Sequence, residues 1–162
     1  MSAFIPPDFS IPSGISTPEF RLRMLTVHDL VKDFDAVITS VDRLRGIFGP
    51  DNRWPEGLTL EQDLIDLGWH QKEFQLRRSF AYTVMSLDEA QCLGCVYVEP
   101  SEKTACDARV ILWVRQSEAD SGLDATLYAS VKQWLADAWP FSAVAFPGRE
   151  VSWADWQALP HR

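Results

Sequence analysis

Three cysteines are the first residues whose type and spacing suggest chemistry. Cys92 and Cys95 form a Cys-x-x-Cys pair, a spacing used by thiol redox sites and by zinc sites. Redox pairs lie at a helix N-terminus, whereas Val96-Tyr97-Val98 is typical of a strand. A zinc site needs a second pair of ligands, and Cys106 is the one cysteine left. Strand alternation places Cys92 and Cys95 on opposite faces, so we interpret the cysteines as buried hydrophobic residues and expect no metal site.

A histidine and a glutamate lie three residues apart within a segment that has a helical pattern. At this spacing His70 and Glu73 can orient each other toward a Gly- and Pro-rich loop at 46–57. The alternative is a hydrogen bond at the helix surface, or a histidine at the edge of the core. In the loop, Arg53 and Trp54 present a cation and an aromatic wall to an acidic or planar ligand. Alternatively, Trp54 caps the core. We take Trp54, His70 and Glu73 as candidate substrate-binding residues.

One arginine follows the last predicted strand. Arg149 comes after Pro147-Gly148, at the edge where parallel sheets open a ligand crevice. This position favours a phosphate contact, and the alternative is an exposed arginine in a turn. The sequence has no Gly-x-Ser-x-Gly, P-loop or His-Glu-x-x-His motif, so hydrolase, NTPase and metalloprotease functions have no support.

The elements that position these residues follow from hydrophobic periodicity and capping signals. Residues 1–18 hold four prolines and no apolar period, so we expect a loosely attached extended arm without a helix or ladder, followed by one domain over 19–162. We predict strands at 20–25, 80–85, 92–98, 109–115 and 141–146, and helices at 26–44, 59–78 and 121–138, the last capped by Ser121. The order β-α-α-β-β-β-α-β predicts an α+β chain with one mixed sheet. Its strand–helix–strand unit at 109–146 requires a parallel, right-handed crossover.

Composition limits the classes of function. A chain of 162 residues with 46% hydrophobic and 23% charged residues is typical of one soluble globular domain. The net charge of −8 disfavours nucleic acid and anionic membranes as partners. Neither an apolar stretch of about 20 residues nor a secretory signal is present, so we expect a cytoplasmic protein without a membrane association.

Over residues 20–146 this pattern of elements resembles the GNAT superfamily of acyl-CoA-dependent N-acetyltransferases. The most specific segment is Arg109-Val-Ile-Leu-Trp-Val-Arg115, followed by a loop and by Gly122-Leu-Asp-Ala-Thr-Leu127. In the family the backbone of this strand pairs with the pantetheine arm of acetyl-CoA, and the next loop and helix N-terminus hold the pyrophosphate. The resemblance implies cofactor contacts at Trp113, Val114, Arg115, Ser121, Gly122 and Leu123, with Arg149 as a further phosphate contact.

The phosphate loop departs from the family pattern of Arg/Gln-x-x-Gly-x-Gly/Ala. Gly122 is the one glycine in the loop between Arg115 and the helix, and Glu118, Asp120 and Asp124 lie within about a turn of the helix start. These carboxylates compete for the positive helix end and repel a pyrophosphate. Two functions therefore remain open. The first is acyl transfer from acetyl-CoA to a small amine, and the second is a GNAT-shaped module that binds a ligand or partner without CoA.

The resemblance also implies a general base for the acceptor amine and a tyrosine acid near the C-terminus. We nominate Glu99, at the end of a strand, and Asp107, just before the central strand, as bases; the alternative is that both are surface carboxylates in turns. The tyrosine does not transfer, because none follows Tyr128. Family members continue with another helix and further strands after the fifth, so we expect either a partner copy that completes the sheet in a homodimer, which an uncovered edge strand favours, or a shallower pocket.

Overall fold

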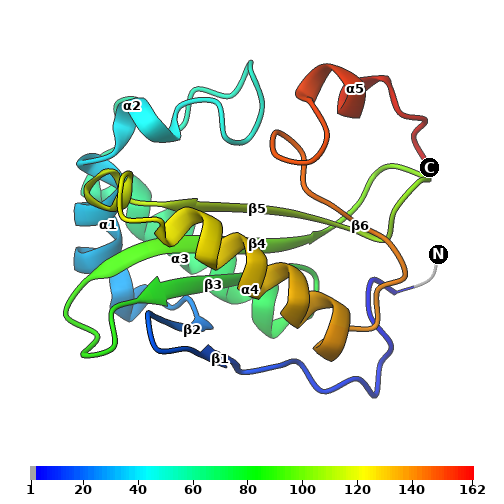
Figure 1. The fold of residues 1–162 in the computed structure, drawn as a ribbon, viewed down its shortest axis with the longest axis horizontal. Coiled ribbons are helices and arrows are strands. Elements are labelled where there is room, and N and C mark those ends of the chain that lie inside the picture. Colours follow the sequence, from blue (N-terminus) through cyan, green and yellow to red (C-terminus); the bar gives the residue numbers. More distant parts are fainter. Residues whose placement is uncertain (1–2) are drawn as a thin grey trace.

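The computed structural model describes residues 3–162 as one curled, six-stranded sheet with helices on both faces (Figure 1). The strands are β1 (Gly14–Ser16), β2 (Arg21–Met24), β3 (Phe80–Met85), β4 (Cys92–Pro100), β5 (Ala108–Val114) and β6 (Val144–Ala145). The helices are η1 (Val27–Asp29), α1 (Leu30–Ile38), α2 (Val41–Leu44), α3 (Leu60–Gln75), η2 (Gln116–Glu118), α4 (Leu123–Ala138) and α5 (Trp153–Ala158), of which η1 and η2 are 3₁₀ turns. The predicted α+β class and mixed, mostly antiparallel sheet are confirmed.

The strands lie in the order β1-β2-β3-β4-β5-β6, and only the β5–β6 pair is parallel. This parallel pair, joined through α4, is the crossover that the sequence predicts. The predicted strand at 141–146 shortens to Val144–Ala145, because the carboxylate of Asp107 accepts the backbone N–H groups of Ser142 and Ala143 and holds them in a turn.

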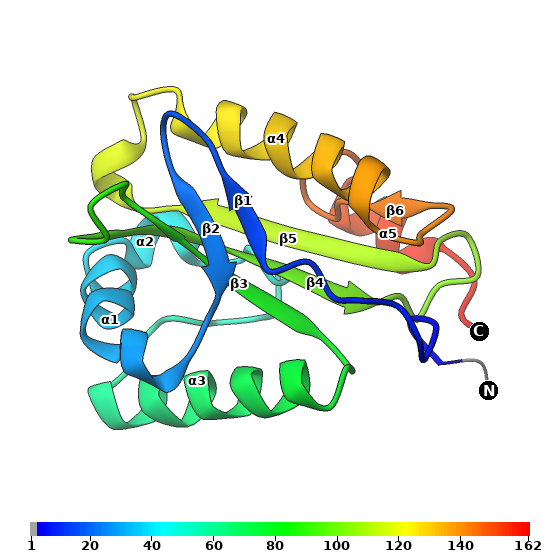
Figure 2. The ribbon, with the colours of Figure 1, turned by 90° about the horizontal axis from the view of Figure 1, so that it is seen from below.

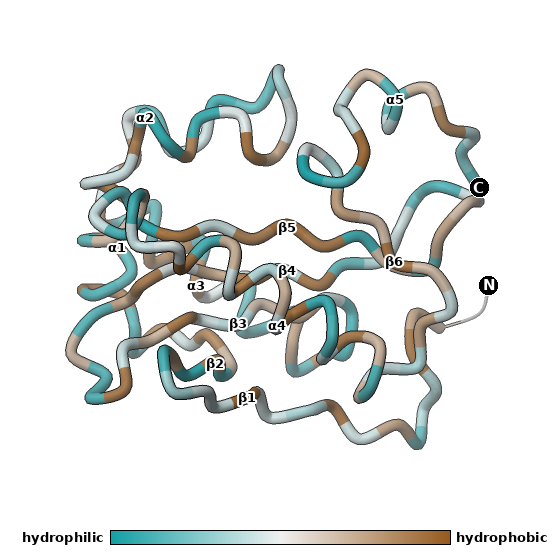
Figure 3. The backbone as a smooth tube through the Cα atoms, viewed as in Figure 1, coloured by the Kyte–Doolittle hydropathy of each residue, from teal (hydrophilic) through white to brown (hydrophobic). Residues whose placement is uncertain are grey.

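Two apolar clusters lie on the two faces of the sheet. In Figure 2, α4 covers one face and α1 and α3 cover the other. Side chains of β5 alternate between them: Val110 and Leu112 pack under α4, while Ile111 and Trp113 pack toward α1 and α3. Figure 3 shows the resulting hydrophobic run along β5, as expected for a central strand buried on both faces.

The helix boundaries follow their caps, with two corrections to the predictions. The capping box of Thr59 and Gln62 starts α3 as predicted. The predicted helix over 26–44 is interrupted at Thr39–Ser40, because the Ser40 hydroxyl donates to the carbonyl of Ala36 and accepts the N–H of Gln116. The N-cap of α4 is Gly122 at φ +83°, not Ser121, whose hydroxyl accepts the N–H of Leu123 instead.

The expectation of an N-terminal arm without a ladder is wrong. Gly14–Ser16 form β1 and pair antiparallel with β2, because the prolines of this segment fall outside the strand and Pro18 lies in the connecting turn. The segment before β1 is held to the domain: Ile5 is buried, and the Arg77 guanidinium donates to the carbonyls of Pro6 and Phe9. The domain boundary at residue 19 stays a prediction.

The cysteine geometry is also corrected. A bulge opposite Val84 and Met85 inserts Leu93 into β4, since Val84 pairs with Gly94 and Met85 with Cys92. The extra residue shifts the alternation, so Cys92 and Cys95 lie in the same core cluster rather than on opposite faces. All three cysteines are free and buried, as predicted.

A buried lysine holds the C-terminal segment against the sheet. Lys103 is 2% exposed, and its ammonium donates to the carbonyls of Gln157 (3.3 Å) and Leu159 (3.0 Å). The same ammonium lies 5.8 Å from the ring centre of Trp156. These contacts fix α5, and α5 places Trp153 beside the central strand.

Candidate functional site

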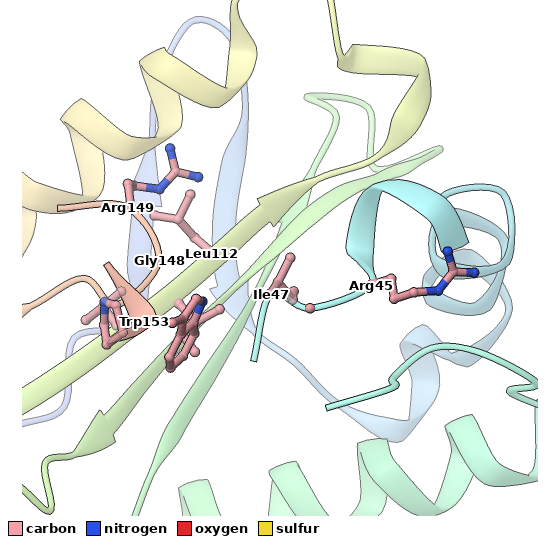
Figure 4. A pocket seen from close by; sticks show the side chains of 10 residues that line it. Arg45, Ile47, Leu112, Gly148, Arg149 and Trp153 are labelled. Carbon is pink, nitrogen blue, oxygen red and sulfur yellow. The ribbon is translucent and has the colours of Figure 1, made fainter. Parts of the chain in front are cut away.

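The sheet opens where β5 and β6 part. The two strands pair only at Ala108–Val144 and Arg109–Ala145. Beyond this point a cavity of about 580 Å³ lies between them, which we call the wedge cavity. Figure 4 shows Ile47 and Trp153 entering it from different segments, with Arg149 near Leu112. The lining residues are Arg45, Gly46, Ile47, Val110, Ile111, Leu112, Pro147, Gly148, Arg149 and Trp153.

The backbone of β5 faces this cavity with hydrogen-bonding groups. The Arg115 N–H donates to the carbonyl of Leu93 on β4, which fixes the alternation along β5. The N–H and C=O groups of Leu112 therefore point away from β4, beyond the last pairing of β5 with β6 at Arg109–Ala145. A strand edge of this kind can pair with the amide groups of an extended ligand.

One wall of the wedge cavity depends on a glycine. Gly148 adopts φ +80°, and a Cβ there would lie 2.5 Å from the indole Nε1 of Trp153. Only glycine satisfies both the left-handed backbone and the close indole. The Pro147-Gly148 turn therefore allows Trp153, which the sequence analysis did not select, to line the site.

Two arginines and one carboxylate lie together at the start of α4. Arg149 donates two hydrogen bonds to Asp124, at 2.7 and 3.0 Å, and its guanidinium lies 5.1 Å from the ring centre of Tyr128. The Nη2 atom of Arg43 is 3.9 Å from Asp124 Oδ1, and its Nε donates to the carbonyl of Val114 at 2.9 Å. Asp124 thus neutralises the cations nearest to the N-terminus of α4.

The predicted phosphate contact at Arg115 points elsewhere. Its side chain is buried, donating to the carbonyl of Cys92 (3.1 Å) and to Asp35 (2.9 Å), so the guanidinium ties β5 to α1 and to β4. Trp113 is buried on the α3 side and donates to the hydroxyl of Tyr97 at 3.1 Å. Neither side chain lines the wedge cavity, whose lining on β5 lies closer to the strand start, at 110–112.

The other predicted cofactor residues lie at the N-terminus of α4. Ser121, Gly122 and Leu123 line a separate cavity of about 310 Å³ with Glu118 and Thr126. Gly122 has open space where a Cβ would stand, so the backbone there is accessible to a ligand. Of the predicted phosphate-binding side chains, Arg149 alone lines the wedge cavity.

The two nominated bases make structural contacts. Glu99 accepts the Nε–H of Arg109 at 2.9 Å across neighbouring strands. Asp107 holds the turn before β6 through the backbone N–H groups at 142 and 143. Neither residue lines the wedge cavity or the second cavity described next.

A second cavity of about 240 Å³ lies between α1, α3 and the loop after α2, and we call it the acidic cavity. Two of the candidate substrate-binding residues, Trp54 and His70, line this cavity together, and their role in substrate binding stays a prediction. Glu73 is not among the lining residues and pairs with Lys72 (3.2 Å) and Arg78 (3.6 Å). The lining residues are Asp33, Phe48, Asn52, Trp54, Asp63, Asp66, Leu67, Trp69, His70 and Tyr97.

Burial governs the protonation of this cavity. Burial and then the neighbouring carboxyl of Asp63 raise the pKa of Asp33 well above its usual value. Burial also raises the pKa values of Asp63 and Asp66. The His70 ring, packed between Trp69 and Tyr97, has its pKa lowered to about 4 by burial and is neutral at pH 7.

Sequence reasoning missed the three aspartates and Trp153. Asp33 and Asp63 are 30 positions apart on different helices, and no local spacing indicates that α1 and α3 pack together there. The Gly-Pro signals near 46–57 and 147–148 did mark the loops that line both cavities.

Comparison with solved structures places this arrangement among known folds. A ribosomal-protein-S5-alanine acetyltransferase from Vibrio fischeri matches with a TM-score of 0.63 and 13% identity, over 78% of this chain and 69% of that one. A ribosomal L7/L12 alpha-N-protein acetyltransferase in complex with coenzyme A matches with a TM-score of 0.58 and 15% identity, over 76% and 66% of the two chains. An acetyltransferase from Thermus thermophilus matches with a TM-score of 0.56 and 19% identity, over 77% and 74%.

The sequence itself matches no protein-family profile and no curated protein. No helix within residues 3–162 combines the length and the apolar character needed to span a membrane. This chain therefore spans roughly two thirds to three quarters of the acetyltransferase structures it resembles, at low identity. Together with the predicted order of elements and the opening between β5 and β6, these matches show that the chain has the fold of the GNAT acetyltransferases.

Proposed function

We infer that this chain is an N-acyltransferase that moves an acyl group from acyl-CoA to an amine. The observation that carries this proposal is the wedge cavity, where the backbone groups of Leu112 on β5 face away from β4 beyond the last pairing with β6. In the GNAT acetyltransferases, whose fold this chain resembles, the backbone of a strand edge of this kind pairs with the pantetheine arm of acyl-CoA. One of the similar acetyltransferase structures was determined with coenzyme A bound.

The residues present fit the coenzyme in part. The β5 edge suits the two amide groups of a pantetheine arm, and the accessible backbone at Gly122 suits a phosphate. Asp124 opposes the fit, because it engages Arg149, the arginine that lines the cavity. Acyl-CoA would supply the reactive thioester. The amine nitrogen forms the amide bond as the C–S bond breaks, and its proton passes to the leaving thiolate or to water.

The acceptor is proposed to be a small amine. Two of the similar structures are named as acetyltransferases of ribosomal proteins, which supports an amino group as the acceptor without naming it for this chain. The acidic cavity lies next to the loop that also lines the wedge cavity, since Ile47 belongs to one and Phe48 to the other. This adjacency gives an acceptor a place close to the thioester.

A second candidate is a module of the same fold that binds a ligand or partner without CoA. The pair of hydrogen bonds between Arg149 and Asp124 favours it, because the arginine that would hold a phosphate already has an anion. A homodimer also stays a proposal for either function.

Thermal unfolding with acetyl-CoA separates the two functions. A ligand at about 100 times its Kd adds about 2.7 kcal/mol, which raises the Tm of a domain of this size by roughly 5–10 °C. We expect this rise with both acetyl-CoA and CoA at millimolar concentration. The absence of any rise with either compound would contradict the transferase and favour the binding module.

A glycine pair provides matched variants for this experiment. Gly122 and Gly57 have φ values of +83° and +73°, and neither has an atom within 4 Å of a Cβ position. Asparagine tolerates this backbone, so both Gly→Asn variants should fold. We expect Gly122→Asn to lose most of the acetyl-CoA shift, because its side chain fills the phosphate approach, while Gly57→Asn keeps it. Equal shifts in the two variants would argue against phosphate binding at α4.

A further inference from the structure

The outward face of α3 carries apolar side chains where a helix at the surface is usually polar. Five of the eight exposed large apolar side chains within residues 3–162 belong to α3 or to the residue that follows it. They are Leu60, Leu64, Ile65, Trp69 and Leu76. Figure 2 shows α3 along the rim of the molecule, with the sheet on one side of it only. A concentration of exposed apolar side chains of this kind marks an interaction surface.

This face also carries opposite charges at its two ends. The helical repeat places Glu61, Ile65, Gly68 and Lys72 on one stripe, and the apolar side chains flank it on both sides. Glu61 lies in the first turn of α3 and Lys72 in the last. The Lys72 ammonium is 3.2 Å from Glu73, yet its side chain stays 53% exposed and can contact a second carboxylate. The stripe is therefore acidic at one end and basic at the other.

Two copies of this stripe are complementary when the helices run antiparallel. Ile65 comes four residues after Glu61, and Gly68 comes four residues before Lys72. The register that places Glu61 opposite the partner's Lys72 therefore also places Ile65 opposite the partner's Gly68. A two-fold axis repeats both contacts, so one copy of the chain supplies everything that the other needs.

Gly68 supports this register. A glycine inside a helix lowers the stability of that helix. A Cβ at Gly68 would come within 4 Å of one atom among the described residues outside the helix backbone, the Cγ1 of Val27 at 3.9 Å, which is an ordinary contact. Packing within the described chain therefore does not require a glycine here. An isoleucine that approaches from a second helix does, because only glycine leaves room for it against the backbone.

We propose that the chain forms a two-fold symmetric homodimer through antiparallel α3 helices, with Glu61 of each copy paired to the partner's Lys72. An anionic membrane does not suit this face, because α3 carries four carboxylates and one lysine. The contact differs from the completed sheet that the sequence predicts for a dimer. Trp69 also lines the acidic cavity, so the second copy lies at the rim of that cavity. This inference does not depend on the proposed function.

Sedimentation of the full chain over a range of concentrations tests the association. We expect a reversible shift from monomer to dimer as the concentration rises. A monomer at every concentration would overturn the proposal.

Charge reversal tests the register. Glu61→Lys and Lys72→Glu each place like charges opposite each other at both contacts, so each should weaken the dimer roughly tenfold or more. An equimolar mixture of the two variants restores opposite charges at both contacts and should dimerise as tightly as the native chain. This recovery also shows that both variants are folded. Native affinity in either variant alone, or no association in the mixture, would overturn the antiparallel pairing.

Matched variants on other elements provide the controls. Asp137→Lys and Lys132→Glu make the same two charge changes at exposed positions of α4 and should leave the dissociation constant unchanged. Ile65→Gln should weaken the dimer, whereas Leu87→Gln, at an exposed apolar position in the turn after β3, should not. A dimer that persists equally in all of these variants would lie elsewhere, as at a sheet edge, and would contradict the α3 contact.

Discussion

At the scale of single residues, Asp33 and Asp63 are in conflict with their surroundings. Both carboxyls are buried, and Asp63 adds to burial in raising the pKa of Asp33, whereas the hydrogen bond from Asp33 lowers the pKa of Asp63. A buried pair of this kind favours the state in which Asp33 keeps its proton and donates it to Asp63.

This conflict makes the stability of the protein depend on pH. The folded-state pKa of Asp33 lies well above its unfolded value of about 3.9, so the native state keeps a proton that the unfolded chain releases as the pH rises. The contribution of Asp33 to the free energy of unfolding is therefore at its maximum below about pH 4. It falls by about 1.4 kcal/mol for each pH unit between the unfolded and the folded pKa. We expect Asp33→Asn to be more stable than the native protein at pH 7, with the gain vanishing near pH 4.

Urea unfolding at several pH values measures this difference. Asp42→Asn, at an exposed position of α2, is the matched control and should follow the native curve. Parallel curves for Asp33→Asn and the native protein would show that Asp33 ionises normally.

At the scale of elements, the N-terminus of α4 decides whether the fold binds a nucleotide-like anion. Its dipole and Arg149 favour negative charge, and Asp124 already supplies one. The surrounding loop carries further acids, so this helix end is less attractive to a phosphate than a glycine-rich loop would be. The element is intact, and its charge is what differs from the family pattern.

Removing that internal carboxylate should strengthen coenzyme binding. Asp124→Asn frees Arg149 and removes one repulsive charge, a change of about 1 kcal/mol, or roughly a fivefold lower Kd for CoA. Asp137→Asn removes the same charge from an exposed position in the last turn of α4 and should leave the Kd unchanged. Calorimetry with CoA measures both. A weaker affinity in Asp124→Asn would show that the carboxylate helps to orient Arg149 for the ligand.

At the scale of the whole molecule, sequence patterns predicted what local periodicity encodes. The stripe of α4, the capping box at Thr59 and the parallel crossover are all present, because each depends on residues close in sequence or on a chain-topology rule. The bulge at Leu93 and strand β1 were missed, since both depend on which partner a strand finds.

In the candidate site, too, features that depend on neighbouring residues could be predicted, and features that depend on distant segments could not. Trp54 and His70 could be nominated from the sequence because Trp54 lies in a loop marked by Gly and Pro and His70 on a predicted helix; both line the acidic cavity, and their role in binding stays a prediction. The Asp33–Asp63 pair and the wall formed by Trp153 arise only when segments distant in sequence pack together. The side-chain direction of Arg115 was not predictable either, because it is set by Asp35 on another element.

The bulge in β4 has a consequence for thiol labelling. It places Cys92 and Cys95 in one sealed core, where burial raises the pKa of Cys92 to about 12 and that of Cys95 well above its usual value. A thiol in this state is alkylated only when the sheet opens.

Cys106 lies instead in the turn between β4 and β5, where Arg162 donates to its carbonyl, so fraying of the C-terminal segment exposes it first. When iodoacetamide labelling is followed by mass spectrometry, we therefore expect two alkylation rates. Cys106 should be alkylated fast, and Cys92 and Cys95 should be alkylated slowly and together. Single adducts at Cys92 or Cys95 that accumulate as fast as those at Cys106 would mean that the bulge is where the sheet opens first.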